Sequence, residues 1–431
     1  MSRLGDPLLK VDHLKVYFKI LKGTVHAVDD VTFNLERGQT MGLVGESGCG
    51  KTTMAFAVTR LLPTNGRVLG GEIVFDGQVI VRADLPTEVE DVLTRPDWKP
   101  RLEEVLRREE AEFAAFRAGG GQILEAQEQM EDEYAFHGEI QGILAQHRDT
   151  PDEARDRLRR VTEQHMRGLT AGYRRRRRER EIERRIAAIR WSKVAMIFQS
   201  AMNAFNPVYR VGDQIEEALF THFPDMTKEE SRARVLALFD LVGIDRSRVD
   251  GFPHEFSGGM RQRSMIAMAL ACNPQLLIAD EPTTALDVIM QDRILAEIRD
   301  LQKELNIAMM IITHDISVVA EVGERIGVMY AGKLFEYGSI QEIFEKPANP
   351  YTIGLLSAFP SIKGPRRKLR SIPGSPPDLS NPPSGCRFHP RCQFAQEVCR
   401  QAEPPIVEVA PGHLSQCHFA REIYEGTLRG A

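Results

Sequence analysis

A glycine-rich segment near the N-terminus has the residue types and the spacing that hold the phosphates of a nucleotide. It fits the pattern G-x-x-x-x-G-K-[ST] and reads Gly45-Glu46-Ser47-Gly48-Cys49-Gly50-Lys51-Thr52. Glycines let backbone N–H groups wrap the phosphates, and the N-terminus of a following helix adds a positive dipole end. We expect Lys51 to reach the β- and γ-phosphates and the Thr52 hydroxyl to bind Mg²⁺. Thr53, the next residue, completes the nucleotide-binding set of this loop.

The flanking segments are those that such a loop needs. A strand-like run at 41–44 precedes it, and a helix-like run at 53–62 follows it. Strand, loop and helix in this order are the context in which the pattern binds phosphate. The alternative is a glycine-rich turn with a chance Lys-Thr pair, and the flanking segments disfavour it. Alone, the motif indicates only a P-loop NTPase.

Two adjacent carboxylates, Asp280 and Glu281, end an apolar run that begins at Leu276. Just upstream, a second glycine-containing segment opens a helix-like run, and it reads Phe256-Ser257-Gly258-Gly259-Met260-Arg261-Gln262-Arg263. Ser-Gly-Gly at a helix start forms a second anion site. These segments resemble the Walker B segment and the signature peptide of the ATP-binding subunits of ABC transporters. A flexible loop before a helix, the alternative, does not explain why it lies just before the acidic strand.

The resemblance implies catalytic and metal-binding roles for residues that follow the expected strands. Asp280 is the expected Mg²⁺ partner, and Glu281 is the expected general base for the attacking water. His314 resembles the family's switch histidine, which contacts the γ-phosphate, so Lys51, Glu281 and His314 form the predicted catalytic set. Gln199 resembles the glutamine that touches Mg²⁺ and connects ATP to the membrane partner.

Further positions are expected to contact the nucleotide. Phe18 lies where the family's adenine-stacking aromatic falls, with Tyr17 beside it, although an aromatic residue in a strand is more often part of the core. Asp287 ends a tetrapeptide that looks like the family's D-loop, which meets the partner subunit. The signature contributes Ser257, Gly258, Gly259 and Gln262.

Each of these motifs occurs once in the chain. In the family, ATP lies between the phosphate loop of one subunit and the signature of another. The chain is therefore expected to supply half of each site. It must pair with a second ABC ATPase subunit, either a copy of itself or a paralogue.

Length and composition limit the alternatives. The 431 residues predict two or three domains. A net charge of −5 argues against a nucleic-acid binder that works by bulk electrostatics, so no nucleic-acid partner is expected. No apolar run approaches the roughly 18 residues needed to cross a bilayer, and the first ten residues show no secretory signal. We therefore expect a peripheral protein on the cytoplasmic face of the membrane.

The resemblance implies an α/β fold for most of the chain. This is an ABC-type P-loop NTPase domain with a RecA-like parallel sheet core, an antiparallel β subdomain and a helical subdomain. We assign it to residues 1–82 and 190–348, with the helical subdomain at about 200–273. A charged helical insertion at 83–189 and a C-terminal extension at 349–431 complete the chain.

The insertion is rich in helix formers and divides by charge. Its first part is acidic, and its last part is basic, with five consecutive arginines at 174–178. A glycine break at 119–121 favours an exposed helical hairpin or small bundle. Pairing of the two arms with each other is the favoured interpretation. Contact of the arginines with anionic lipid or nucleic acid is the alternative.

Two further segments, 200–207 and 349–360, are similar to the oligopeptide/dipeptide and nickel importer branch. The resemblance implies uptake of di- or oligopeptides through two separate membrane permease subunits that dock near 199–211. An extracytoplasmic peptide-binding protein would be an indirect partner. Nickel or another solute is the alternative cargo. A non-transport ATPase of the DNA-repair or chromosome type is a second alternative, but its helical arm follows the glutamine loop, whereas this insertion precedes Gln199.

Four of the six cysteines lie in the C-terminal extension, at Cys386, Cys392, Cys399 and Cys417. Clustered thiolates suit tetrahedral Zn²⁺ or an iron–sulfur cluster, but the spacing lacks the C-x-x-C pairs usual for structural zinc. Members of the peptide-importer branch carry such a tail, and some bind a [4Fe–4S] cluster. We therefore expect a [4Fe–4S] cluster, with Zn²⁺ as second choice. Lower-ranked substitute ligands are His389, His413 and His418.

Overall fold

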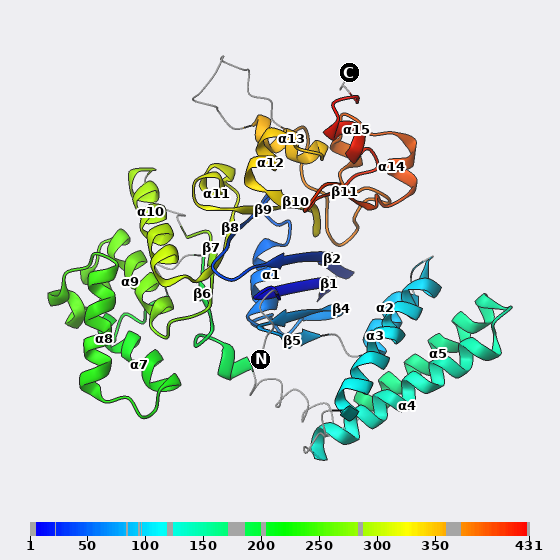
Figure 1. Cartoon of the computed structure of the whole chain (residues 1–431), viewed down its shortest axis with the longest axis horizontal. Coiled ribbons are helices and arrows are strands. Elements are labelled where there is room, and N and C mark those ends of the chain that lie inside the picture. Colours follow the sequence, from blue (N-terminus) through cyan, green and yellow to red (C-terminus); the bar gives the residue numbers. More distant parts are fainter. Residues whose placement is uncertain are drawn as a thin grey trace. The chain divides into compact units, whose positions relative to one another are not determined.

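The computed structural model describes residues 6–21, 23–82, 85–93, 95, 97–118, 124–170, 186–199, 204–282, 288–358 and 372–428. Internal contacts divide the chain into two compact units (Figure 1). The first unit comprises Met1–Arg67, Ile73–Val81 and Ile186–Ala431, and the second comprises Val68–Glu72 and Arg82–Arg185. Among the described helices, none combines the length and the apolar composition that a bilayer crossing needs.

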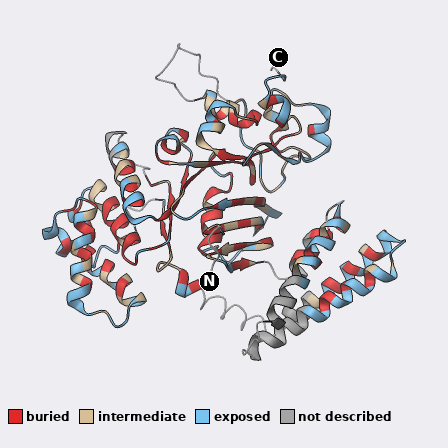
Figure 2. Ribbon diagram, viewed as in Figure 1, coloured by how far each residue is buried: buried red, intermediate tan, exposed pale blue. Residues whose placement is uncertain are grey.

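Five parallel strands form the centre of the first unit, in the order β9-β3-β8-β7-β6. They are β3 (Thr40–Val44), β6 (Val194–Ile197), β7 (Leu276–Asp280), β8 (Ala308–Thr313) and β9 (Arg325–Tyr330). Every residue of β7 and β8 is buried, and this is why both strands are nearly continuous apolar runs rather than alternating ones. Figure 2 shows the buried strands at the centre of the unit.

The sheet continues beyond β9 with three antiparallel strands, in the order β10-β12-β11. They are β10 (Lys333–Ser339), β12 (His413–Gln416) and β11 (Ile406–Ala410). The last two lie in the C-terminal extension, so backbone hydrogen bonds join the extension to the main sheet. The short helices around these strands are α12 (Ile340–Glu345), α13 (Pro350–Ser357), η4 (His389–Arg391), α14 (Glu397–Gln401) and α15 (Ala420–Tyr424).

A second sheet of the order β2-β1-β4-β5 lies beside the parallel one. Its strands are β1 (Leu9–Ile20), β2 (Gly23–Leu35), β4 (Gly66–Phe75) and β5 (Gln78–Arg82). The first two form a long antiparallel hairpin, in which buried and partly buried residues alternate over parts of each strand. Three helices follow strands of the parallel sheet: α1 (Lys51–Val58), α10 (Val288–Leu305) and α11 (Ile316–Val322).

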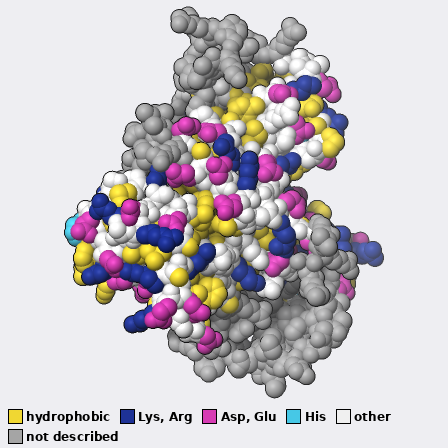
Figure 3. Space-filling view, turned by 60° about the vertical axis from the view of Figure 1, so that its left-hand side comes forward, with side chains coloured by type: hydrophobic (Ala, Val, Ile, Leu, Met, Phe, Trp, Pro, Cys, Tyr) yellow, Lys and Arg dark blue, Asp and Glu magenta, His cyan; other side chains and the backbone are white. Residues whose placement is uncertain are grey.

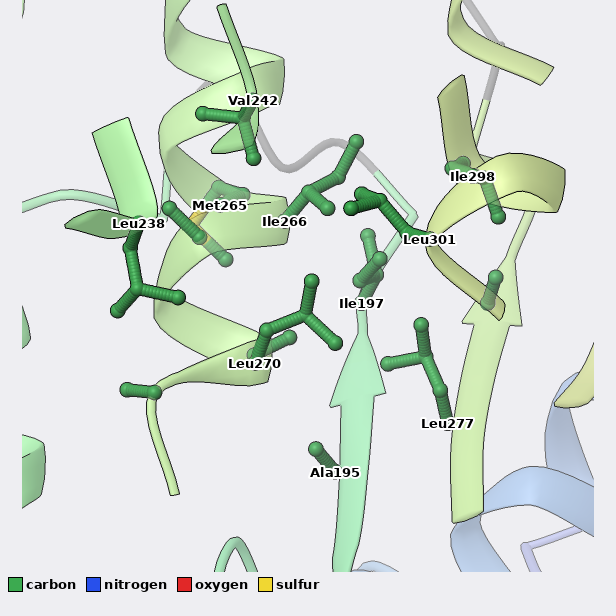
Figure 4. Close-up of a cluster of buried hydrophobic side chains, with 14 of the residues drawn as sticks. Ala195, Ile197, Leu238, Val242, Met265, Ile266, Leu270, Leu277, Ile298 and Leu301 are labelled. Atoms are coloured by element: carbon green, nitrogen blue, oxygen red, sulfur yellow. The ribbon is translucent and has the colours of Figure 1, made fainter. Parts of the chain in front are cut away.

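A helical region packs against β6, the edge strand of the parallel sheet. Its members are α7 (Val211–His222), α8 (Lys228–Leu241), η2 (Arg246–Asp250), η3 (Pro253–Glu255) and α9 (Gly258–Leu270). In Figure 4, Ile266 and Leu270 of α9 lie next to Ile197 of β6, and all three side chains are buried. On the outer face, basic and acidic side chains are interspersed among hydrophobic ones (Figure 3).

The second unit is helical and has a hydrophobic core of its own. Its helices are α2 (Leu85–Leu93), α3 (Trp98–Ala118), α4 (Leu124–Gln146) and α5 (Pro151–Thr170). Phe136 and Leu158 are among the buried residues of this core, and the Phe136 ring stacks on His165 at 4.4 Å. The arginine run at 174–178 and the glycine break at 119–121 lie outside the described residues, so the predicted pairing of the two arms stays a prediction.

Candidate functional site

Four segments that are far apart in the sequence meet at one edge of the parallel sheet. Strands β3, β8, β7 and β6 are neighbours, so their carboxyl ends lie side by side. The phosphate loop follows β3, His314 follows β8, and Gln199 comes just after β6. Asp280 ends β7, and Glu281 comes next. Ligands of open parallel sheets bind outside this carboxyl edge.

Three glycines of the phosphate loop have positive φ angles, and the backbone is also crowded at two of them. Gly45, Gly48 and Gly50 have φ angles of 153°, 78° and 107°. A Cβ on Gly45 would lie 2.1 Å from the Met329 carbonyl oxygen, and a Cβ on Gly50 would lie 2.0 Å from that of Ala27. The loop can therefore follow this path only with glycine there, and α1 begins directly after Gly50.

Lys51 lies inside the loop and is buried. Its ammonium donates to the carbonyl oxygens of Gly45 at 2.8 Å and Glu46 at 3.0 Å. Cys49 is buried beside it, and burial raises the pKa of this thiol. Ser47 and Gly48 form the exposed tip of the loop. Thr52 and Thr53 are half-buried in the first turn of α1.

Asp280 is a buried carboxylate next to Thr52. The residue is 1% exposed, and its Oδ1 has no hydrogen-bond partner among the described residues. Burial raises the pKa of Asp280, whereas a hydrogen bond with the Thr52 side chain opposes that shift. A carboxylate oxygen without a partner beside a threonine hydroxyl fits the oxygen ligands that Mg²⁺ takes in phosphate-loop proteins.

Glu281 lies between the residues contributed by β6 and β8. Gln199 Nε2 donates to Glu281 Oε2 at 2.8 Å, and His314 Nδ1 lies 3.2 Å from Glu281 Oε1. The backbone of Glu281 has φ 47°, a left-handed conformation that is strained in a residue with a side chain and is typical of functional sites. A carboxylate held between an amide and an imidazole can orient a water molecule and accept its proton.

The signature segment forms the start of α9. The Ser257 side chain accepts a hydrogen bond from the Met260 N–H at 3.3 Å, and Gly258 and Gly259 form the first turn. The buried Gln262 side chain donates to the Pro282 carbonyl oxygen at 2.6 Å. This contact ties α9 to the residue that follows Glu281.

The structure separates α9 from the phosphate loop of the same chain. Helix α9 packs on β6, which is three strand positions from β3, or about 14 Å at normal strand spacing. Figure 1 likewise shows α9 and α1 apart. The signature therefore lies away from the loop that it is expected to complement.

The two candidate adenine-contacting residues are half-buried in β1. Tyr17 stacks on His26 with ring centres 4.1 Å apart, and its hydroxyl donates to Asp29 Oδ1 at 2.8 Å. Phe18 lies so close to Gly66 that a Cβ there would be 2.7 Å from the phenyl ring. Asp287, the D-loop candidate, lies outside the described residues.

One contact of the phosphate loop was missed by the sequence analysis. Arg391 and Tyr351, both in the C-terminal extension, bond to Glu46. Positions 46 and 391 are 345 residues apart, and no local pattern connects them.

The expectation of a metal or iron–sulfur centre in the extension is wrong. The four cysteines line one pocket together with Phe388. However, the described part of the chain has no group of three or more His, Cys, Asp or Glu residues that could hold a metal ion. The thiols are free, and burial raises the pKa of Cys386 to about 11 and that of Cys392 and Cys417 to about 12. Protonated thiols pack as small hydrophobic groups.

The three histidines named as substitute ligands have other partners. His413 Nε2 lies 2.7 Å from Glu336 Oε1, and His418 Nε2 lies 3.0 Å from the Ala402 carbonyl oxygen. His389 Nδ1 lies 3.0 Å from the Cys386 carbonyl oxygen. These ring nitrogens form hydrogen bonds within the first unit, to the partners just named.

Comparison with known proteins gives the family. The ABC transporter family model matches residues 28–178 and 169–284, and the model for the oligopeptide/dipeptide transporter C-terminal region matches residues 335–399. The oligopeptide transport ATP-binding protein OppD of Salmonella typhimurium is 36% identical over 415 residues, covering 96% of this chain and 94% of that protein. OppD of Bacillus subtilis is 35% identical over 410 residues, covering 94% and 87%.

Solved structures that resemble the chain include the dimeric structure of MJ0796, a bacterial ABC transporter cassette. It is 20% identical, with a TM-score of 0.48, and the match covers 77% of this chain and 98% of that one. The assignment rests on the sequence matches, which extend over nearly the whole chain. The chain therefore belongs to the ABC transporter family of ATPases, in the group of oligopeptide transport ATP-binding proteins.

Proposed function

We propose that this chain hydrolyses ATP to drive the uptake of di- and oligopeptides through separate membrane permease subunits. The observation that carries the proposal is the match of residues 335–399 to the C-terminal region of oligopeptide/dipeptide transporters. Relatives named as oligopeptide transport ATP-binding proteins also align over almost their full length. The carboxyl-edge residues supply the chemistry that ATP hydrolysis needs.

Each polar residue at this edge is assigned one task. Lys51 binds the β- and γ-phosphates, and Thr52, Asp280 and Gln199 hold Mg²⁺, which neutralises phosphate charge when bound. Glu281 accepts the proton of the attacking water, and His314 contacts the γ-phosphate. The hydrogen bonds from Gln199 and His314 to Glu281 support this assignment because they place all three groups around one point.

We infer that the complete ATP site requires a second subunit, either a copy of this chain or a paralogue. The position of α9 on β6 supports this, because Ser257, Gly258 and Gly259 lie away from the loop of their own chain. ATP would then lie between the phosphate loop of one subunit and the signature of the other. Asp287 would contribute to the same interface.

We also propose that two permease subunits dock near 199–211, which would place the chain at the cytoplasmic face of a membrane. An extracytoplasmic peptide-binding protein would deliver the cargo. The side chains of Val208 and Tyr209 support this surface because they are 74% and 59% exposed. Exposed apolar side chains of this size suit a protein interface. Gln199, at the start of the same segment in the sequence, bonds to Glu281, which supports a role for this segment in linking the permease to the catalytic group.

The test is peptide uptake in cells that lack the gene. Wild-type chain should restore uptake of a labelled tripeptide, whereas Glu281→Gln should bind ATP normally and lower turnover and uptake by about a hundredfold or more, because the general base is lost. Glu304→Gln changes an exposed carboxylate of α10 and should behave like wild type. Normal turnover in Glu281→Gln would overturn the catalytic assignment. Restoration of nickel uptake instead of peptide uptake would overturn the cargo.

A further inference from the structure

Arg391 of the C-terminal extension forms a bidentate ion pair with the phosphate loop. Its Nη1 donates to Glu46 Oε2 at 2.6 Å, and its Nη2 donates to Glu46 Oε1 at 2.9 Å. The Arg391 side chain is 7% exposed, and the Glu46 side chain is 25% exposed. Two parallel charge-assisted hydrogen bonds are strong and fix orientation as well as distance. Since Glu46 is the second residue of the loop, this pair constrains the loop itself.

Arg391 is itself held in one orientation. Its Nε donates to the Pro373 carbonyl oxygen at 2.7 Å, and its Nη1 also donates to the Tyr330 hydroxyl at 3.2 Å. The guanidinium carbon lies 5.6 Å from the centre of the Tyr330 ring. A guanidinium fixed on several sides loses little freedom when it binds Glu46.

The backbone of Glu46 is bonded to the extension as well. Its N–H donates to the Tyr351 hydroxyl at 3.0 Å. Tyr351 is fully buried and packs against Tyr330 and Phe388, with ring centres 4.6 and 5.4 Å away. Phe388 lies three residues before Arg391, so this aromatic cluster anchors the segment that carries the arginine.

These contacts do not depend on the phosphate-loop lysine. Lys51 donates to the carbonyl oxygens of Gly45 and Glu46 from inside the loop. A bound phosphate competes for the same ammonium. When Lys51 turns to the phosphate, the bonds from Arg391 and to Tyr351 still hold Glu46. The extension can therefore keep the loop in shape while its lysine binds the nucleotide.

A second arginine of the same segment is linked to the region where the adenine base is expected to bind. Arg387 is buried and bonds to the carboxylate of Asp29 and to the Ala331 carbonyl oxygen. Asp29 also accepts a hydrogen bond from the Tyr17 hydroxyl at 2.8 Å. Tyr17 is one of the two candidate adenine-contacting residues. Arg387 and Arg391 thus link one short segment of the extension to both the phosphate loop and β1.

We propose that Arg391 and Arg387 are positioning residues for ATP, so that the C-terminal extension is a structural part of the nucleotide site. Arg391 acts on the phosphates through Glu46, and Arg387 acts on the base through Asp29 and Tyr17. Neither arginine needs to touch the nucleotide. The inference rests on the proposed nucleotide site and is independent of the transported cargo.

The test uses the purified full chain, with binding of a fluorescent ATP analogue and ATP hydrolysis as readouts. Arg391→Met is expected to weaken analogue binding and raise KM for ATP by about fivefold to twentyfold, because the loop loses a charge-assisted bidentate pair. The turnover number should change much less, since Glu281 and His314 are untouched. Arg391→Lys should recover part of the affinity. Glu46→Gln combined with Arg391→Met should be no worse than the more affected single variant, because both act through one contact.

Arg325→Met is the matched control. Arg325 also ties the extension to the sheet, since its Nη2 donates to the Gly412 carbonyl oxygen at 2.8 Å and its guanidinium covers Tyr337. Arg325 is the first residue of β9 and lies at the amino ends of the parallel strands, whereas the phosphate loop lies at their carboxyl ends. This variant should lower the melting temperature and keep wild-type affinity for the analogue.

Two results would overturn the inference alone: wild-type affinity in Arg391→Met, or equal loss of affinity in Arg391→Met and Arg325→Met. If Arg391→Met does not fold, unchanged affinity in both Arg391→Lys and Glu46→Gln overturns it in the same way. A wild-type chain that binds no nucleotide would overturn the proposed nucleotide site, and this inference with it.

Discussion

Asp280 and Glu281 are neighbours in the sequence but lie in different surroundings. Asp280 ends a buried strand, and its Oδ1 has no partner among the described residues. Glu281 turns out of the strand with a left-handed backbone and meets Gln199 and His314. Asp280 is thus buried where a bound cation would offset the cost of burying its negative charge. Glu281 lies among groups that can orient a water molecule. This difference supports a division of labour between metal binding and proton transfer.

At the residue scale, Asp280→Asn is expected to stabilise the chain in the absence of nucleotide and metal. Burial raises the pKa of Asp280 above its ordinary value of 3.8, so the native state binds its proton more tightly than the unfolded state does. The charged form therefore destabilises the fold above the raised pKa. At pH 7 the variant should melt about 2 to 4 °C higher than wild type. The gain should shrink as the pH falls towards the ordinary value, and ATP hydrolysis should be lost.

Thermal unfolding at several pH values measures this effect. Asp225→Asn, at an exposed position, should leave the melting temperature unchanged. A lower melting temperature for Asp280→Asn at pH 7 would contradict the prediction, because it would mean that the native state prefers the charged carboxylate.

At the scale of elements, the phosphate loop owes its path to glycines with different constraints. Gly50 has a left-handed backbone and is also crowded, since a Cβ there would lie 2.0 Å from a backbone oxygen of β2. Gly48 is left-handed too, but a Cβ there would meet nothing within 4 Å. The two positions separate the cost of backbone strain from the cost of a clash.

Gly50→Ala should therefore cost more than Gly48→Ala. Strain alone is expected to cost about 1 kcal/mol or somewhat more at Gly48, and the backbone clash at Gly50 adds to it. We expect a large loss of affinity for ATP in Gly50→Ala and a smaller one in Gly48→Ala, measured with the same fluorescent analogue. Equal affinities in the two variants would show that the crowding at Gly50 relaxes without cost.

At the scale of the whole molecule, the chain has separate hydrophobic cores in its two compact units. Helices α2, α3, α4 and α5 do not enlarge the core of the first unit, because their buried apolar residues form a separate cluster. A unit with its own core can lose stability without changing the site in the other unit.

Leu158→Ala is expected to destabilise only the second unit, by about 2 to 5 kcal/mol, because it leaves a cavity at a fully buried position. Limited proteolysis should then begin within 82–185, and KM and turnover for ATP should stay at wild-type values. Leu238→Ala is the matched variant in the first unit, where Leu238 packs in the cluster with α9. It should lower ATP hydrolysis. Loss of hydrolysis in Leu158→Ala would contradict independent cores.

Local sequence pattern was enough to predict those functional parts of this protein that consist of one short segment. Strand, glycine loop and helix follow one another in the sequence, so the phosphate loop and the acidic strand end were predictable, and the resemblance to ABC ATP-binding subunits is confirmed. The cysteine prediction was wrong because spacing reports neither burial nor protonation, and both are set by the surrounding fold.

Only the tertiary structure decided which distant residues support the site. The extension adds β12 and β11 to the main sheet and brings Arg391 to Glu46, across 345 residues of sequence. A contact of this kind leaves no periodicity or motif, because in the sequence alone each partner is an isolated charged residue with nothing to mark it as buried. Sequence determined the loop that binds phosphate; the folding of the C-terminal extension onto the sheet decided what holds that loop in place.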